Sequence, residues 1–471
     1  MPRTKKTTTS KKVPPVIITD GSSADKKPRL RNWSGLIYTL FSALVIIGGT
    51  YLAIRWAQGD FRLDQNADLI ARETGLLHAT STPKGAQVYI DGKLTSVTDN
   101  TIYLAPGEYD VVINKDGYSS WNKRIRIEKA LVSQTNATLY PYSPSITSIT
   151  YTGVSLPLVS PDGSKILFYT DTASAKNKNG LYVLDVSNTT RSPHQICDND
   201  PDYNLEQAQY LWSPDSNEVL VVTDHKTFLL NTSNFVNLQA APDVSLQLST
   251  TLASWEEDLA LREQQFAEKI PLAALDTIRE NSRNMFLSPD KTKILYTATG
   301  EASIPDNLIT ALPAPNSQPQ VRQLEPGKMY IYDSYEDRNY LLGDAIATDS
   351  AKMLLTTPVP LSSTPFGSTQ PIIHHSLRSD DLDQTLTNFQ NYYGDHLTRL
   401  WNWMPDSTHL LAVIDQQIVL ITYDGTNPTV IYSGPFQDDF ALPATDNNSI
   451  LILTTFNPDS PANFYAIELN K

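Results

Sequence analysis

Only a few short segments of this 471-residue chain combine side chains that serve as ligands or nucleophiles. His374 and His375 are the only adjacent histidines, and neighbours on a strand point to opposite faces, which disfavours a shared metal ion. Segment 198–206 (DNDPDYNLE) alternates oxygen side chains as calcium loops do, but it lacks the Gly and the Glu that an EF-hand loop needs at its sixth and twelfth positions. We therefore expect a solvated loop there, and no ligand role for the weaker acidic run at 378–383 (RSDDLD).

Two further features are more consistent with a packing role than with ligand binding or catalysis. Trp401 and Trp403 fall on one face of an expected strand, where they would pack between sheets or stack on a sugar ring; packing is favoured. Cys197 is the only cysteine, which excludes an intrachain disulfide. The chain has no G-x-S-x-G, H-E-x-x-H or P-loop motif. The sequence thus predicts no catalytic, cofactor-binding or metal-binding residues, no cofactor, and a protein that is not an enzyme.

Charge is distributed unevenly along the chain. Residues 1–32 carry nine Lys or Arg and two Asp, a net charge of +7, whereas the residues after Arg55 sum to −22. Nucleic-acid binding requires a positive surface that displaces counterions from phosphates. The acidic body therefore excludes nucleic acid as its partner.

A 22-residue run without charge, Trp33 to Ile54, predicts one transmembrane helix over 33–55. At about 1.5 Å per residue, such a helix covers the roughly 30 Å of hydrocarbon in a bilayer. The run is longer than the apolar core of a signal peptide, and Ala53-Ile54-Arg55 is a poor cleavage site, so we expect an uncleaved anchor. Such a protein would contact the lipid bilayer through residues 33–55.

The basic residues before the helix set its expected direction. Cytoplasmic flanks are enriched in Lys and Arg, so residues 1–32 should be a disordered cytoplasmic tail, and the later domains should lie outside the cytoplasm. Residues 56–75 are a polar linker. The expected location is thus the cell membrane, with a single pass and extracytoplasmic C-terminal domains.

Residues 76–141 predict a small β-sandwich, because short apolar runs alternate with turn signals. The motifs are PKGA at 83–86, VYIDG at 88–92, APGEY at 105–109 and KDGY at 115–118. In this order they resemble the PEGA domain, whose middle segment is often G-x-T-P-like, whereas this chain has LTSVTD at 94–99. The resemblance implies a non-catalytic sandwich of bacterial and archaeal envelope proteins.

From residue 148 to 471 the chain repeats a strand, an S-P-D-type turn and two further strands. The turns begin at Ser160, Ser213, Ser288 and Met404, and weaker units are expected at 352–377 and 450–469. A period of roughly 50 residues with three or four strands is typical of a β-propeller blade. The repeats resemble TolB-like, WD-type propellers, and six blades or seven are expected; a long β-sandwich array is the alternative.

Helix-forming composition at 251–283 interrupts this pattern and predicts two helices inserted between blades. The fold class is therefore mainly β: one transmembrane helix, a PEGA-like sandwich, and a propeller with a short helical insertion. We expect a membrane-anchored binding or structural protein whose two domains recognise an envelope protein or a glycan. The alternative is an envelope hydrolase or lyase with its active site in the propeller channel.

Overall fold

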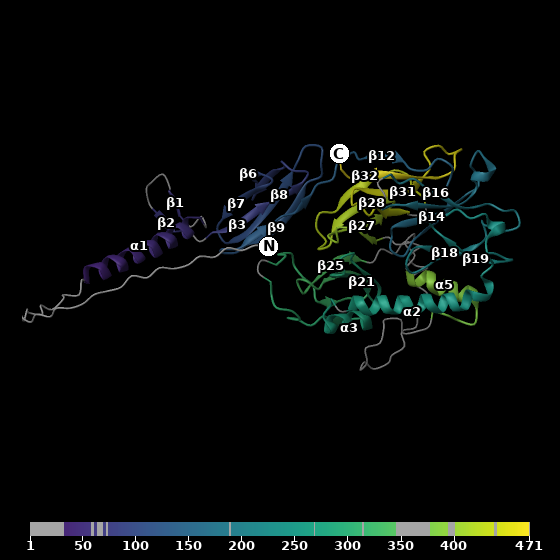
Figure 1. The fold of residues 1–471 in the computed structure, drawn as a ribbon. Helices are drawn as coiled ribbons and strands as arrows, with labels where there is room; N and C mark the ends of the chain where they lie inside the picture. The colour runs from purple at the N-terminus through teal and green to yellow at the C-terminus, as the bar shows by residue number, and fades with distance from the viewer. Residues whose placement is uncertain are drawn as a thin grey trace, which may run out of the picture. The chain divides into compact units, whose positions relative to one another are not determined.

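The structure is a computed structural model that describes residues 33–57, 61–63, 69–71, 74–187, 190–267, 269–312, 315–344, 377–393, 401–437 and 440–470 (Figure 1). The chain divides into two compact units, Met1–Ala71 and Arg72–Lys471. The expected tail at 1–32 lies outside the described residues. So do His374 and His375, and most of the expected weak blade at 352–377.

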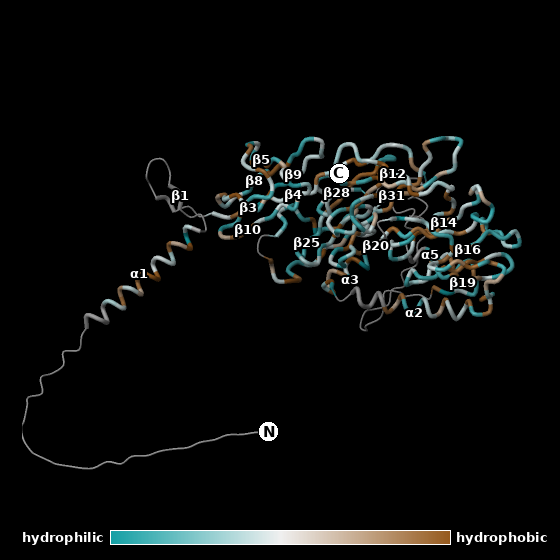
Figure 2. The backbone as a smooth tube through the Cα atoms, turned by 45° about the horizontal axis from the view of Figure 1, so that its top comes forward, coloured by the Kyte–Doolittle hydropathy of each residue, from teal (hydrophilic) through white to brown (hydrophobic). Residues whose placement is uncertain are grey.

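The first unit contains helix α1 (Trp33–Ala57) and a hairpin of β1 (Phe61–Leu63) and β2 (Leu69–Ala71). Within α1, the stretch Tyr38–Trp56 is long and apolar enough to cross a membrane, and none of it is buried in the protein. Apolar residues recur along this helix (Figure 2). A soluble helix would bury such a surface against other elements. The predicted apolar helix at 33–55 is confirmed as a helix.

The sandwich begins the second unit and consists of nine strands. Its larger sheet has the order β6-β5-β8-β9, a three-stranded sheet has the order β10-β3-β7, and β4 pairs with β11. The bounds are β3 Gly75–Ala79, β4 Ser81–Thr82, β5 Gln87–Ile90, β6 Lys93–Val97, β7 Asn100–Leu104, β8 Gly107–Asn114, β9 Trp121–Ile127, β10 Val132–Gln134 and β11 Ala137–Thr138.

Alternation of apolar residues along these strands forms the sandwich core. Val88, Val111 and Ile113 point inward from the larger sheet and meet Leu77 of β3. The turn between β5 and β6 has positive φ at both Asp91 (49°) and Gly92 (79°), the conformation that Asp-Gly favours in a two-residue hairpin. The motif glycines therefore meet backbone requirements.

The remainder of the second unit contains six described antiparallel sheets: the two-stranded sheet of β22 (Ala302–Ser303) and β23 (Gln323–Leu324), and five larger sheets, which we call blades 1 to 5. Each blade is an antiparallel meander. In blade 3 the chain leaves the meander between β21 and β24 to form β22 and β23, and blade 5 also receives β12 from the chain before blade 1. Blade 1 is β13 Ser155–Val159, β14 Lys165–Thr170, β15 Gly180–Asp185 and β16 His194–Asp198; blade 2 is β17 Gln209–Trp212, β18 Glu218–Val222 and β19 Thr227–Asn231; blade 3 is β20 Ser282–Leu287, β21 Lys293–Ala298, β24 Lys328–Asp333 and β25 Arg338–Asp344; blade 4 is β26 Trp401–Trp403, β27 His409–Ile414, β28 Gln417–Thr422 and β29 Thr429–Tyr432; blade 5 is β30 Ala441–Pro443, β31 Ser449–Thr454, β32 Asn463–Glu468 and β12 Ser145–Ser148.

Shared apolar cores give the spatial order of the blades. Blade 1 packs on blade 2 through one cluster and on blade 5 through another. Blade 5 also packs on blade 4, and blade 4 packs on blade 3. The order 2-1-5-4-3, with face-to-face meanders, is that of a β-propeller, so the predicted fold class is confirmed.

Helices lie where blades 2 and 3 would otherwise meet. Helices α2 (Leu248–Ala267) and α5 (Leu382–Tyr393) cover the outer face of blade 2, with Trp255 and Phe389 buried against Leu220. Helix α3 (Leu272–Asn281) packs on the corresponding face of blade 3 (Figure 1). Short elements complete the described residues: η1 Lys176–Lys178, η2 Leu238–Ala240, η3 Ser245–Gln247, β22 Ala302–Ser303 and β23 Gln323–Leu324.

The same turn joins the first two strands of each blade, with the S-P-D motif in blades 1 to 3, Met-Pro-Asp in blade 4 and Ala-Thr-Asp in blade 5. In blade 1 the Ser160 hydroxyl and the Ser164 backbone N–H donate to Asp162 Oδ1, and Gly163 takes φ 72°. The positions equivalent to Gly163 also have positive φ: Ser216 61°, Lys291 63°, Ser407 56° and Asn447 58°. Asp in these turns thus accepts local hydrogen bonds, a role that Asx turns explain without any ligand.

The positive φ predicts a stability effect at Gly163. Replacing Gly163 by Ala should lower the free energy of unfolding by about 1 kcal/mol, because a Cβ is strained in the left-handed region. Nothing crowds this position, so the cost would come from the backbone alone. Thermal unfolding of Gly163→Ala measures it, with Gly107→Ala as the control because a Cβ there meets only ordinary contacts. Equal stability of the two variants would contradict the prediction.

Candidate interaction site at the junction of sandwich and propeller

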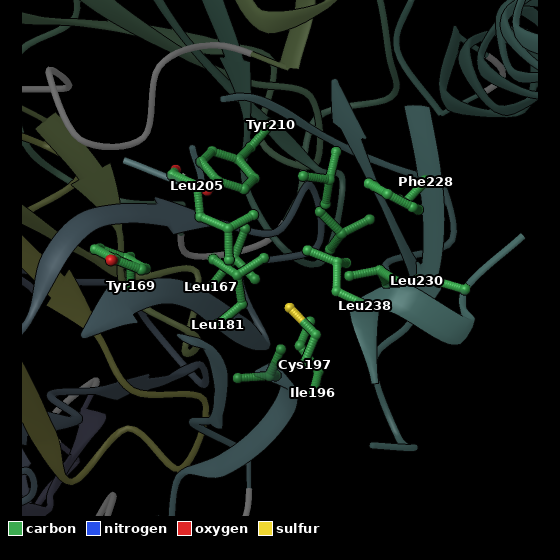
Figure 3. Close-up of a cluster of buried hydrophobic side chains, with 14 of the residues drawn as sticks. Leu167, Tyr169, Leu181, Ile196, Cys197, Leu205, Tyr210, Phe228, Leu230 and Leu238 are labelled. Carbon is green, nitrogen blue, oxygen red and sulfur yellow. Dashed lines mark hydrogen bonds between the residues drawn. The ribbon is translucent and has the colours of Figure 1, made fainter. Parts of the chain in front are cut away.

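Cys197 is part of the core between blades 1 and 2. Its side chain is 0% exposed among Leu181, Leu205 and Leu238 (Figure 3). Burial raises the pKa of the thiol to about 12. The thiolate is the reactive form, so this cysteine is chemically protected in the folded protein.

We therefore predict that native protein does not react with a maleimide or a disulfide reagent at pH 8. After unfolding in denaturant, one thiol per chain should react. A mass measurement of the labelled protein checks both states, and stoichiometric labelling of the native protein would show that Cys197 is accessible.

The predicted packing of the two indoles is confirmed. Trp401 and Trp403 lie partly buried at the contact of blades 3 and 4, and Trp403 Nε1 donates to Phe286 O across it (3.1 Å). The pair therefore stabilises the blade contact, and neither ring is presented as a stacking platform.

The loop at 198–206 is less exposed than the sequence predicts. The Asp198 carboxylate accepts hydrogen bonds from Asn237 Nδ2 (2.8 Å) and Leu238 N (2.9 Å), which caps η2. Tyr203 and Leu205 enter the apolar core, so the loop is pinned to it. Sequence reasoning missed this because apolar residues alternating with Asp were interpreted as a solvated chain.

Metal ligation finds no support in the part of the chain that the structure describes, where no group of three or more His, Cys, Asp or Glu side chains could hold an ion. Arg378, in the acidic run, instead donates from Nε to Glu256 Oε2 of α2 (2.8 Å). That run leads into α5 and fixes it to α2.

A buried polar network joins the sandwich to the propeller. Lys123 of β9 lies 2.5 Å from Asp424 Oδ2, in the turn after β28, and this carboxylate is 0% exposed. Asn316 Nδ2 donates to the same oxygen (2.8 Å), and the Thr426 hydroxyl donates to the other (2.6 Å). Burial alone would raise the pKa of Asp424, but the Lys123 charge and these hydrogen bonds outweigh it and lower the pKa.

Backbone contacts continue the junction along β9. The Ser317 hydroxyl (2.6 Å) and Gln318 Nε2 (2.9 Å) donate to the carbonyl of Arg124. The Asn122 N–H donates to Asn427 Oδ1 (2.7 Å). Because both side-chain and main-chain groups are paired, β9 is held against two propeller segments, the chain at 316–318 and the turn at 424–427.

Glu336, which follows the third strand of blade 3, holds Asn316 in place within this network. Both carboxylate oxygens of Glu336 accept from the Asn316 N–H (3.2 Å), and burial, together with the nearby Asp333 charge, raises the pKa of Glu336. The Asn316 side chain also donates to the Tyr423 hydroxyl (3.2 Å). Asn316 is thereby oriented toward Asp424 by partners on two blades.

A polar pocket opens beside the junction. It has a volume of about 230 Å³ and is lined by Arg126 and Glu128 from the end of β9, by the segment 315–320, and by Arg338 at the start of β25. The sandwich and the propeller each supply part of its wall. It is smaller than the roughly 300–1,000 Å³ typical of pockets for drug-sized ligands.

Sequence reasoning predicted none of the junction residues. The one available signal was the Asp or Asn that ends the third strand of each repeat. Its side chain accepts a backbone N–H two residues later in four blades: Asp185, Asn231, Asp333 and Asp424. Asp424 differs from the others through Lys123 and Asn316, which are 301 and 108 residues away, and no local pattern reveals either partner.

The PEGA domain family matches residues 74–142. This chain therefore carries a PEGA domain, as the turn motifs predict. No curated protein matches the chain.

Solved structures similar to the chain include two TolB proteins. TolB from Agrobacterium tumefaciens is 12% identical, with 69% of this chain and 83% of that chain covered and a TM-score of 0.20. TolB from Acinetobacter baumannii is 10% identical, with 76% and 59% covered and a TM-score of 0.19. The β-propeller domain of the Trilobed protease from Pyrococcus furiosus is 12% identical, with 85% and 99% covered and a TM-score of 0.18. The propeller assignment here rests on the blades themselves.

Proposed function

We propose that this chain is a membrane-anchored, non-catalytic binding protein of the bacterial cell envelope. Helix α1 anchors it, the PEGA domain holds the propeller away from the bilayer, and the propeller presents loops for recognition of an envelope protein or glycan. A propeller suits this role because its loops cluster on the faces of a rigid scaffold.

The buried junction is the observation that carries the proposal. A spacer that merely linked two domains would need only a flexible chain, and interfaces between domains of one chain are commonly mobile. Here a lysine of the PEGA domain pairs with a fully buried carboxylate of the propeller, and a propeller amide donates to the same carboxylate oxygen. The PEGA domain therefore sets the orientation of the propeller.

Anchoring and direction are tested in cells that make the full chain with a C-terminal tag. We expect the protein to stay with membranes after alkaline extraction, and protease added from outside to remove the tagged domains. Release by alkali, or protection of the tag until the membrane is permeabilised, would overturn this part of the proposal.

Binding is tested by chemical cross-linking in the same cells, followed by purification through the tag. We expect a defined envelope component to be recovered, and its yield to fall when Lys123→Met loosens the junction. The matched control is Lys84→Met. It also removes a lysine of the sandwich, but the Lys84 side chain is 84% exposed, whereas that of Lys123 is 17% exposed. Equal yields from the two variants would show that orientation by the junction is unimportant for binding.

A further inference from the structure

The pocket beside the junction contains hydrogen-bond donors and acceptors that have no partner among the described residues. Among the described residues, Arg338 donates one hydrogen bond, from Nη1 to Gln318 O (3.2 Å), so its Nε and Nη2 remain as donors. Arg126 directs Nε and Nη2 to Glu108 Oε1 (3.2 and 2.7 Å), which leaves Nη1. The Glu128 carboxylate accepts no hydrogen bond within the described part of the chain, although it lines the same pocket.

The pocket brings two arginines together in an otherwise acidic part of the protein. The residues after Arg55 sum to −22, whereas the pocket lining contains two arginines and one glutamate. Two guanidinium groups around one small cavity are suited to a carboxylate, which arginine binds in a planar, bidentate geometry.

The other lining groups indicate what accompanies the carboxylate. Glu128 is an acceptor, and the amide of Gln320 offers both a donor and an acceptor. These groups match hydroxyls better than apolar atoms. Aromatic side chains are missing from the lining, so a bound ring would be held by hydrogen bonds.

We propose that this pocket binds an acidic sugar unit, with its carboxylate on Arg126 and Arg338 and a hydroxyl on Glu128. The inference rests on the proposed binding role and names a ligand class for it. The sugar would be either a free uronic acid or the acidic residue of an envelope polysaccharide. Because both domains line the pocket, an occupied pocket would also favour the docked arrangement.

The test is titration of the full chain in detergent micelles with glucuronate, followed by NMR or calorimetry. We expect a dissociation constant in the millimolar range, as suits a small open site. Glucose, the neutral counterpart, should bind at least about tenfold more weakly, because it lacks the charge-assisted hydrogen bonds. A glucuronate-containing oligosaccharide distinguishes the two sources: tighter binding than the monosaccharide indicates the polysaccharide, and equal binding indicates the free acid.

The chain provides a matched pair of variants on one strand. Arg126→Gln and Arg124→Gln each remove an arginine of β9 that pairs with an acidic residue of β8, and the two side chains are 60% and 61% exposed. Only Arg126 lines the pocket. We expect Arg126→Gln and Arg338→Gln to weaken glucuronate binding about tenfold and Arg124→Gln to leave it unchanged.

Three results would overturn the inference: no saturable binding of glucuronate, equal binding of glucose, or equal losses in Arg124→Gln and Arg126→Gln. Binding of acetyl-dialanine as tight as that of glucuronate would also overturn it, since that ligand offers a carboxylate without hydroxyls. These titrations are independent of the cross-linking in cells. If glucuronate does not bind but the protein still captures its envelope partner in cells, the ligand class is refuted and the binding role remains.

Discussion

Replacement of Lys123 by Met is expected to lower the free energy of unfolding by roughly 3 kcal/mol, since removing one partner of a buried ion pair leaves the other charge uncompensated. Asp424 would keep its hydrogen bonds from Asn316 and Thr426, which places the cost at the lower end of the usual range. Its carboxylate would nevertheless remain 0% exposed beside an apolar side chain. Chemical denaturation of the full chain in detergent measures the effect.

The pH dependence follows from the lowered pKa of Asp424. A carboxyl with a depressed pKa stabilises the folded state above its unfolded pKa, and this contribution is lost as the pH falls through the folded value. Lys123 helps to depress that pKa from its ordinary value of 3.8. The difference in stability between wild type and Lys123→Met should therefore narrow in acid, below about pH 4.

A double-mutant cycle separates the ion pair from the loss of packing. Lys123→Met and Asp424→Asn together should lower the free energy of unfolding by less than the sum of the two single variants, because the asparagine leaves no uncompensated charge in the buried site. Lys84→Met is the control, and its exposed pair with Asp99 should contribute no more than about 1 kcal/mol. Strict additivity in the cycle would show that Lys123 and Asp424 are energetically independent.

Phe464→Ala is expected to cost about 3–5 kcal/mol, the usual range for removing a buried phenylalanine. Phe464 of β32 is 0% exposed and packs edge-on against Phe168 of blade 1, with ring centroids 5.6 Å apart. It also contacts Phe440 (5.3 Å). The lost packing contacts lie between blades 1 and 5, where the beginning and the end of the propeller sequence meet.

Strand β12 provides a local readout of this variant. Its residues pair with β32, as Ser145 does with Glu468. Amide exchange in β12 should therefore accelerate in Phe464→Ala more than exchange in blade 3, which does not contact blade 5. Phe456→Ala is the control, because that ring is 52% exposed and should cost less than about 1 kcal/mol. Uniform acceleration across all blades would indicate a global loss of stability instead.

Local patterns were sufficient to predict individual turns and helices. The Asp-Gly turn at Asp91 and Gly92 and the repeated S-P-D turns depend on backbone conformations that a few neighbouring residues set. Helices α2 and α3 occur where composition predicted helices, because their apolar positions recur at helical spacing. Such features depend on about ten neighbouring residues, which explains why they can be predicted from one sequence.

The contacts between elements could not be predicted in this way. Lys123 and Asp424 are separated by about 300 residues, and each has an unremarkable local pattern, a basic residue on a strand and an Asp after one. The pocket likewise combines Arg126 with Arg338 from different domains. Only the packing of the sandwich on the propeller brings these residues together.

Rigid docking of the PEGA domain on the propeller is the central claim, and a spin-label distance measurement tests it most directly. Lys93→Cys on β6 and Ser233→Cys after β19 are both exposed, and buried Cys197 should remain unlabelled. We predict one narrow distance distribution in the wild-type background and a broader one when Lys123→Met is added. A broad distribution in the wild-type background would contradict the claim, because it would mean that the two domains move independently.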